Sequence, residues 1–180
     1  SSGNLTLNGG TLTNNSTGFT IDNAIAIGAS GGTINVGGGG GATQLTLSGV
    51  ISGSGTLVKN GQAILQLDGN NTYTGDTSLV AGTLILNHAN ALGTTAGGTT
   101  VAAGTSVRVN GGLTVAEAFT VSGTGKTVSA VDYGALHLLS GSSTLSGNIN
   151  FTGDSDISAA SGSTLTLSGA LGGGAYNLNK

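Results

Sequence analysis

The chain has 180 residues, of which 36 are glycine and none is proline or cysteine, and only 6% are charged, with a formal net charge of −3. Four Lys and Arg residues are too few to neutralise a phosphate backbone. We therefore expect no nucleic-acid partner. Without cysteine there are neither disulfides nor thiolate metal sites. An apolar content of 37% with 3% aromatic residues is too high for a disordered chain and predicts a core of Leu, Ile and Val.

Short apolar-x-apolar triplets recur along the chain at a spacing typical of short structural repeats. Alternate side chains of a β-strand point to opposite faces, so each triplet places two side chains inward and one outward. We interpret the triplets as one column of stacked strands, with one strand in each coil. They begin at Leu5, Ile25, Leu45, Leu65, Leu84, Val107, Val128, Ile149 and Leu165.

A second apolar series falls between these triplets and has the same period. It comprises Leu12, Ile34, Leu57, Leu79, Val101, Phe119, Leu136 and Ile157. Two series with one period indicate two faces of each coil, and repeats too small to bury their own apolar face are typical of a stacked solenoid. The sequence therefore predicts an all-β fold, a parallel β-solenoid (β-helix) with about 20 residues per coil and roughly nine coils.

Glycine, Asn, Ser and Asp cluster between the apolar positions, for example at Asn8–Gly10 and Asn110–Gly112. These residues tolerate the backbone conformations of tight corners, so we expect the chain to turn there. Helix is expected to be minimal. Only Val115–Phe119 and His88–Leu92 have a suitable composition, and both are too short to be stable alone.

Residues 51–93 contain three distinctive stretches: Gly53-Ser-Gly-Thr-Leu-Val-Lys59, then Ala63-Ile-Leu-Gln-Leu-Asp-Gly-Asn-Asn-Thr-Tyr-Thr-Gly75, and then Thr77-Ser-Leu-Val-Ala-Gly-Thr-Leu84 with Asn90-Ala-Leu-Gly93. This segment resembles the passenger-associated transport repeat, also called the autotransporter-associated β-strand repeat. It departs from the family at Ala63, where a glycine is usual, and at Asp76, where the family tends to glycine. Neither difference affects an apolar position.

The resemblance implies a right-handed parallel β-helix in the secreted passenger of a type V system, in which the repeat assists translocation and folding. It also implies an extracellular location at the bacterial cell surface and a membrane translocator outside these residues. We expect residues 1–180 to be a single solenoid segment of a longer passenger. Residues 167–180 parallel residues 47–59, so we expect a further repeat beyond them and open ends that associate end to end.

Three glycine-rich motifs imitate functional sites, and we interpret all of them as corners. Gly28–Gly32 places Ser30 in a nucleophile-like pattern, but that motif requires a following helix, which we do not expect. Gly123–Thr127 places Lys126 as in a phosphate-binding loop, but the leading glycine is missing. The run Gly37–Gly41 lacks the aspartates of calcium-binding repeats.

Isolated charged and imidazole side chains are likewise interpreted as surface groups. Asp154 and Asp156 are too few for a calcium ion, which needs about six or more oxygen ligands. His88 falls in a corner, and His137 and Arg108 fall in outward slots. We therefore predict no catalytic, cofactor-binding or metal-binding residue.

Three hypotheses for function follow. The first is a structural stalk or adhesive passenger segment without enzymatic activity. The second is a self-associating adhesin or filament-forming solenoid, because rods with so little charge lack mutual repulsion. The third and most remote is a polysaccharide-processing enzyme. Expected partners are other copies of the chain, and host-cell or matrix glycans or proteins.

Overall fold

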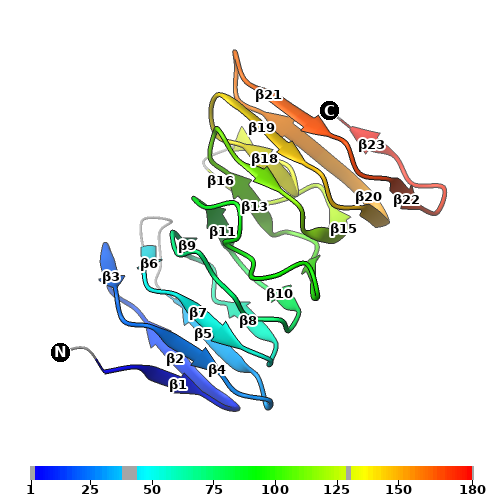
Figure 1. The fold of residues 1–180 in the computed structure, drawn as a ribbon. Coiled ribbons are helices and arrows are strands. Elements are labelled where there is room, and N and C mark those ends of the chain that lie inside the picture. Colours follow the sequence, from blue (N-terminus) through cyan, green and yellow to red (C-terminus); the bar gives the residue numbers. More distant parts are fainter. Residues whose placement is uncertain (1–2, 38–43, 129–130, 180) are drawn as a thin grey trace.

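The computed structural model describes residues 3–37, 44–128 and 131–179. In these residues all regular structure is β-strand, and the strands stack into a rod with the two ends of the chain at opposite ends (Figure 1). Of the two stretches considered for helix, Val115–Phe119 spans the end of one strand and the start of the next, and His88–Leu92 forms a turn. No helix of the described ranges has the length and apolarity to span a membrane.

Each turn of the solenoid runs through three faces, which we number in chain order. Face 1 contains strands β1 (Leu5–Leu7), β4 (Ile25–Ile27), β7 (Ile51–Gly53), β14 (Thr114–Val115), β19 (Ser142–Leu145) and β21 (Thr164–Leu167). Face 2 contains β2 (Gly10–Asn14), β5 (Gly32–Val36), β8 (Leu57–Asn60), β10 (Thr77–Leu79), β12 (Gly98–Val101), β15 (Ala118–Gly123) and β22 (Leu171–Gly173).

Face 3 contains β3 (Phe19–Ile21), β6 (Gln44–Leu47), β9 (Ile64–Leu67), β11 (Thr83–Leu86), β13 (Ser106–Val109) and β18 (Leu136–Leu138). The long strand β20 (Ile149–Ala159) belongs to two faces, because its first residues pair with β15 and its last residues with β18. Strand β23 (Leu178–Asn179) pairs with Ser155 and Asp156 in the middle of β20. All described pairings between turns are parallel, as predicted.

The solenoid makes about seven turns and not the predicted nine. The predicted column of triplets had combined three faces: Ile25 lies on face 1, Leu45 on face 3 and Ile149 on face 2. The turns also differ in length. Leu65 pairs with Leu84 on the following turn, whereas Val107 pairs with Leu136, which is a much longer step along the chain. Because the corner loops differ in length, the spacing of the apolar positions along the sequence does not equal the length of one turn.

The longest of these turns contains an antiparallel pair of short strands, β16 (Thr127–Val128) and β17 (Val131–Asp132). The predicted triplet at Val128 therefore does not join a parallel column. The other two residues of that triplet, Ser129 and Ala130, lie outside the described residues.

The core is a set of aliphatic columns inside the rod. On face 3, Leu65 stacks between Leu45 and Leu84, and all three side chains are fully buried. Leu67 is buried in the same way, whereas Gln66 points outward and is half-buried. Each inward aliphatic side chain contributes about 1.5–3 kcal/mol by leaving water. The predicted inward and outward positions of this strand are confirmed.

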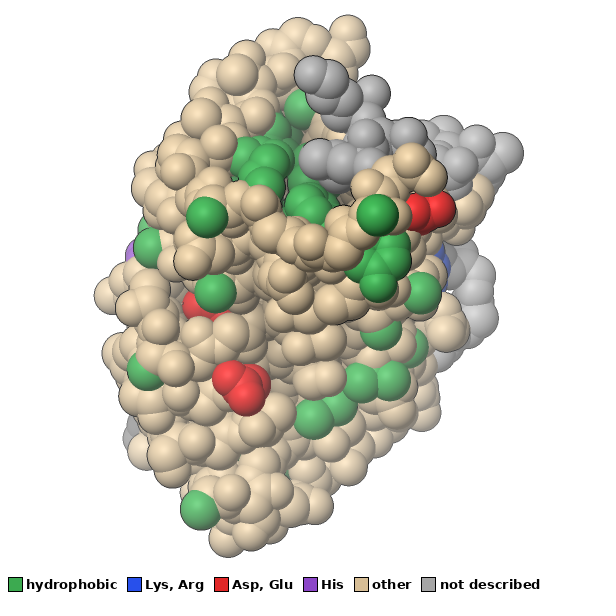
Figure 2. Space-filling view, turned by 90° about the vertical axis from the view of Figure 1, so that its right-hand side faces the viewer, with side chains coloured by type: hydrophobic (Ala, Val, Ile, Leu, Met, Phe, Trp, Pro, Cys, Tyr) green, Lys and Arg blue, Asp and Glu red, His purple; other side chains and the backbone are tan. Residues whose placement is uncertain are grey.

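The outer surface carries little charge. Figure 2 shows one side of the rod, where uncharged polar side chains and backbone predominate and only a few acidic groups appear. Large exposed hydrophobic side chains are scattered, and they comprise Phe19, Val50, Val80, Leu171 and Tyr176.

Candidate functional site

The turn between β9 and β10 is connected to both neighbouring turns by one asparagine. Asn71 is 2% exposed; its Oδ1 accepts a hydrogen bond from the Ile51 amide at 2.8 Å, and its Nδ2 donates to the Ala91 carbonyl at 2.6 Å. Within the described range 44–128, face 1 has no strand at this turn or at the next one. Backbone hydrogen bonds still join these turns, for example from the Thr72 amide to the Ile51 carbonyl, and the Asn71 side chain adds one buried hydrogen bond on each side.

The tyrosine of the same turn fills the interior. Tyr73 is fully buried, and its hydroxyl lies 2.7 Å from Thr77 Oγ1. Burial raises the pKa of this hydroxyl well above its ordinary value, so it stays neutral. The next turn passes directly over the tyrosine at Gly93, which has φ of +84°, and a Cβ at that position would lie 2.4 Å from the Tyr73 carbonyl oxygen. Only glycine fits there.

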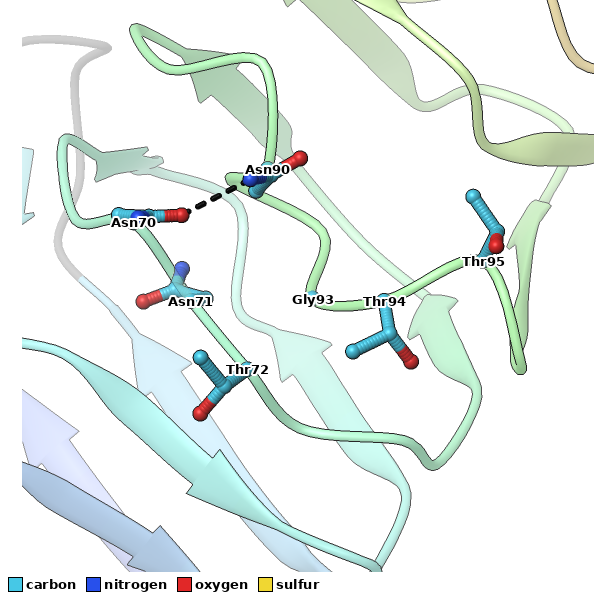
Figure 3. A pocket seen from close by; sticks show the side chains of 7 residues that line it. All are labelled: Asn70, Asn71, Thr72, Asn90, Gly93, Thr94 and Thr95. Carbon is cyan, nitrogen blue, oxygen red and sulfur yellow. Dashed lines mark hydrogen bonds between the residues drawn. The ribbon is translucent and has the colours of Figure 1, made fainter.

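An open groove of about 410 Å³ lies on the outer surface of these two turns. Asn90 Nδ2 donates to Asn70 Oδ1 at 2.9 Å, and Figure 3 shows this pair at one side of the groove and Thr72 and Thr94 at the other. The described residues that line it carry only amide, hydroxyl or glycine groups, and they are Asn70, Asn71, Thr72, Asn90, Gly93, Thr94 and Thr95. The groove is therefore uncharged, and its surface combines amide and hydroxyl groups with threonine methyl groups.

A lysine lies inside the rod just before these turns. Lys59 is fully buried in a face 2 column between Ile34 and Leu79. Its Nζ donates to the carbonyls of Asn60 at 2.8 Å, Gly61 at 2.7 Å and Ala81 at 3.0 Å. Burial, with a smaller contribution from the charge of Lys126, lowers the pKa of Lys59 to about 7.

A second buried ionisable group follows three turns later, just before β15. Glu117 is 4% exposed, and its Oε1 accepts a hydrogen bond from Thr99 Oγ1 at 3.0 Å. Burial raises the pKa of this carboxyl to about 7, the hydrogen bond from Thr99 opposes the shift, and the charge of Asp76 adds to it. Thr99 pairs in register with Thr77, the partner of the Tyr73 hydroxyl, so polar side chains of neighbouring turns lie together inside the solenoid.

Arg108 and His137 occupy outward slots in register on face 3, as predicted, but they are not surface groups. They are 8% and 7% exposed, respectively. Tyr133, which follows the β16–β17 pair, covers them: its ring lies 3.9 Å from the Arg108 guanidinium carbon and stacks edge-on with His137 at 5.1 Å. The prediction that both are surface groups was wrong because the segment around Tyr133, between β17 and β18, folds over this part of the face.

The electrostatics of this covered cluster are unusual. Arg108 Nε and Nη2 are buried without a hydrogen-bond partner among the described residues. Burial lowers the pKa of Arg108, and the Tyr133 hydroxyl opposes that shift. His137 Nδ1 lies 2.8 Å from Ser158 Oγ, and burial followed by the charge of Arg108 lowers the His137 pKa.

Lys126 was predicted to be a solvated corner lysine, and it is half-buried with side-chain contacts to a distant part of the chain. Its Nζ donates to both the main-chain carbonyl and Oε1 of Gln62, 64 residues earlier, and its amide donates to Ser106 Oγ at 2.8 Å. These contacts hold the start of the β16–β17 pair against earlier turns. No helix follows it in the described chain, where a phosphate-binding loop would need one.

The remaining motif residues lie apart from one another at corners. Ser30 is exposed, its amide donates to Asn8 Oδ1 at 2.9 Å, and strand β5 follows it where a nucleophile elbow would need a helix. His88 Nδ1 accepts from the Asn90 amide at 3.0 Å. Of the run Gly37–Gly41, only Gly37 is among the described residues, and its amide donates to the Asn14 carbonyl.

The carboxylate pair lies near the C-terminal end of the rod on β20. Asp154 is exposed and accepts a hydrogen bond from the Asn177 amide at 2.9 Å, while Asp156 is half-buried. Across the ranges that the structure describes, no group of three or more His, Cys, Asp or Glu side chains is placed to hold a metal ion. Asp154 thus contacts the C-terminal turn through Asn177.

Sequence reasoning missed the two buried ionisable groups, although strand alternation contains a signal for both. Lys59 is two residues after the inward Leu57, and Glu117 is two residues before the inward Phe119. Positions two apart in an extended chain share a face. The side-chain contacts of Asn71 between turns had no comparable signal.

Comparison with known families matches the central turns to the repeat that the sequence resembles. The model of the Passenger-associated-transport-repeat matches residues 57–86 and again residues 81–105. Residues 57–105 therefore carry this repeat, and the second match extends past the predicted end at Gly93. Comparison of the chain with curated proteins and with solved structures gives no match.

Proposed function

We propose that this chain is a rod-shaped spacer in the passenger of a secreted bacterial surface protein, and that residues 57–105 are the part on which neighbouring turns assemble. The observation that carries the proposal is the position of Asn71, inside the matched repeat, with one hydrogen bond to the preceding turn and one to the following turn. A solenoid folds by adding turns to an existing turn. A segment that stabilises three turns at once favours that growth after export.

The test uses deletion of one complete turn from the chain displayed through an autotransporter translocator. Deleting residues 64–82 joins Ala63 to Thr83, which is the register partner of Ile64, so the strand columns are preserved. The matched control deletes residues 136–156 and joins Ala135 to Ile157, the register partner of Leu136. The measurement is the amount of protease-resistant passenger on intact cells.

We expect the deletion within the repeat to reduce folded passenger at the cell surface much more than the control deletion. Equal amounts of surface passenger for the two deletions would show that the repeat has no special part in folding after export. Loss of both passengers would instead show that any shortened rod fails, which also contradicts the proposal.

Self-association is a second candidate, favoured by the outward side of face 2. One column of register partners there is uncharged throughout, and it comprises Thr11, Thr33, Val58, Ser78, Thr100, Thr120 and Asn150. Two such columns on different copies could approach without charge repulsion and exchange hydrogen bonds. Ser78→Lys with Thr100→Lys should then abolish cell aggregation, whereas Thr46→Lys on face 3 should not. Aggregation that survives both changes would exclude this surface.

We propose that neither role involves catalysis. The residues with catalytic potential, Ser30, Lys126, His137 and Asp154, are bound to separate parts of the rod and do not form a shared site. Polysaccharide cleavage by the purified chain, abolished by replacing one of them with Ala, would contradict this.

A further inference from the structure

The groove on face 1 is formed by residues of two successive turns. Asn70 and Thr72 come from the turn that follows β9, and Asn90, Thr94 and Thr95 from the turn that follows β11. Neither of these fully described turns has a strand on this face, and both cross it as loop (Figure 3). The hollow is therefore part of the solenoid wall.

Two features keep the hollow open. Gly93 has no side chain to fill it, and its φ of +84° together with the close Tyr73 carbonyl leaves no room for one. Tyr73 itself is fully buried, so its ring occupies the core and not the groove. Asn71 is fixed by its two hydrogen bonds to Ile51 and Ala91, so one wall of the groove is rigid before any ligand arrives. A preformed site loses little entropy on binding.

The polar groups of the side chains that line the groove determine which class of ligand it can bind. The bond from Asn90 Nδ2 to Asn70 Oδ1 orients both amides, and each keeps a second group, a donor on Asn70 and an acceptor on Asn90. Thr72 and Thr94 add hydroxyls, which donate and accept, and methyl groups, which offer apolar contact. Among the described residues no charged side chain lines the groove, so a charged ligand would lose hydration there without a counter-charge.

From this arrangement we propose that the groove binds a short stretch of neutral saccharide. Sugar hydroxyls are both donors and acceptors, as are the groups that line the groove, and a neutral sugar needs no compensating charge. The groove lies within the segment matched by the repeat model, so this part of the chain both holds turns together and contacts glycan. The proposal goes beyond the spacer role and does not depend on how the chain is exported.

The test is an NMR titration of the ¹⁵N-labelled chain with three probes. Cellotetraose presents hydroxyls only, chitotetraose adds acetamido groups, and tetragalacturonate is anionic. We expect one or both neutral probes to shift the amide signals of Thr72, Gly93, Thr94 and Thr95, and tetragalacturonate to leave them unchanged. No shift with either neutral probe, shifts confined to other residues, or equal shifts with the anionic probe would each overturn the proposal.

Two isosteric variants locate the site. Thr72→Val and Thr94→Val each remove one hydroxyl while keeping the shape of the side chain, and each should weaken neutral-saccharide binding roughly three- to tenfold. Thr100→Val, on the outward side of face 2, is the matched control and should bind as the unmodified chain does. Unchanged affinity in both groove variants, or an equal loss in the control, would place binding elsewhere. Failure of export in the deletion experiment above would leave this outcome unaffected.

Discussion

The side-chain Nδ2 of Asn71 donates to the carbonyl oxygen of Ala91 at 2.6 Å, one turn further along the rod. The same side chain accepts a hydrogen bond from the Ile51 amide of the preceding turn. One side chain therefore adds a hydrogen bond on each side of its own turn to the backbone hydrogen bonds that join the same turns, such as those from the Thr72 amide to the Ile51 carbonyl and from the Thr94 amide to the Tyr73 carbonyl.

We expect Asn71→Ala to lower the free energy of unfolding by about 2–4 kcal/mol, because it leaves two buried backbone groups without partners. Urea denaturation followed by circular dichroism measures this change. Asn70→Ala is the control, because Asn70 is exposed and its amide contacts only Asn90 among the described residues; its cost should stay below about 1 kcal/mol. Equal costs for the two variants would contradict the role given to Asn71.

Lys59 should make stability rise with pH above neutrality. Its pKa is lowered from 10.5 to about 7 in the folded chain, so between these values the unfolded chain binds the additional proton. The free energy of unfolding should therefore increase between pH 7 and pH 10 by an amount of the order of a few kcal/mol. Lys59→Met removes the titrating group, and its denaturation midpoint should lose this pH dependence. A parallel pH profile for variant and unmodified chain would exclude Lys59 as the source.

Glu117 should have the opposite effect on the pH dependence of stability, and in a lower pH range. Its pKa is raised from 4.5 to about 7, so the folded chain retains a proton that the unfolded chain has lost, and stability falls as pH rises between these values. Glu117→Gln keeps an acceptor for Thr99 and stays neutral. We expect it to be more stable than the unmodified chain at pH 8 by about 1–3 kcal/mol and nearly equal at pH 4. Thermal melts at the two pH values measure this difference, and a variant that is less stable at pH 8 would refute it.

Tyr133 should control the titration of His137. Burial and the Arg108 charge lower the His137 pKa, and Tyr133 packs against both side chains. Tyr133→Ala should admit water and move the His137 pKa upward toward its ordinary value of 6.5, as followed by NMR of the imidazole protons. Tyr176→Ala, which changes an exposed tyrosine, should leave the titration unaltered. An unchanged His137 titration in Tyr133→Ala would mean that Tyr133 does not shield the cluster.

Much of the local structure followed from the sequence, because strand alternation depends only on the chain itself. The inward positions of Leu65 and Leu67, the outward position of Gln66 and the parallel stacking of turns were all predicted. The Asn-Thr-Tyr-Thr-Gly stretch and its surroundings predicted the repeat at residues 51–93, which overlaps the matched residues 57–105. The same alternation applies to Lys59 and Glu117, whose inward positions follow from Leu57 and Phe119.

Only the tertiary structure decided which strands share a face, because corner loops of different length make turns of unequal length and hide the true register. The same holds for the burial of Arg108 and His137, because both are covered by Tyr133, which lies in the segment between β17 and β18. The groove beside Gly93 also required the stacked turns, since its walls come from two successive turns that are separated in the chain. The alternation of inward and outward side chains depends only on neighbouring residues. The strand register, the covering of Arg108 and His137 and the groove depend on how successive turns pack against each other.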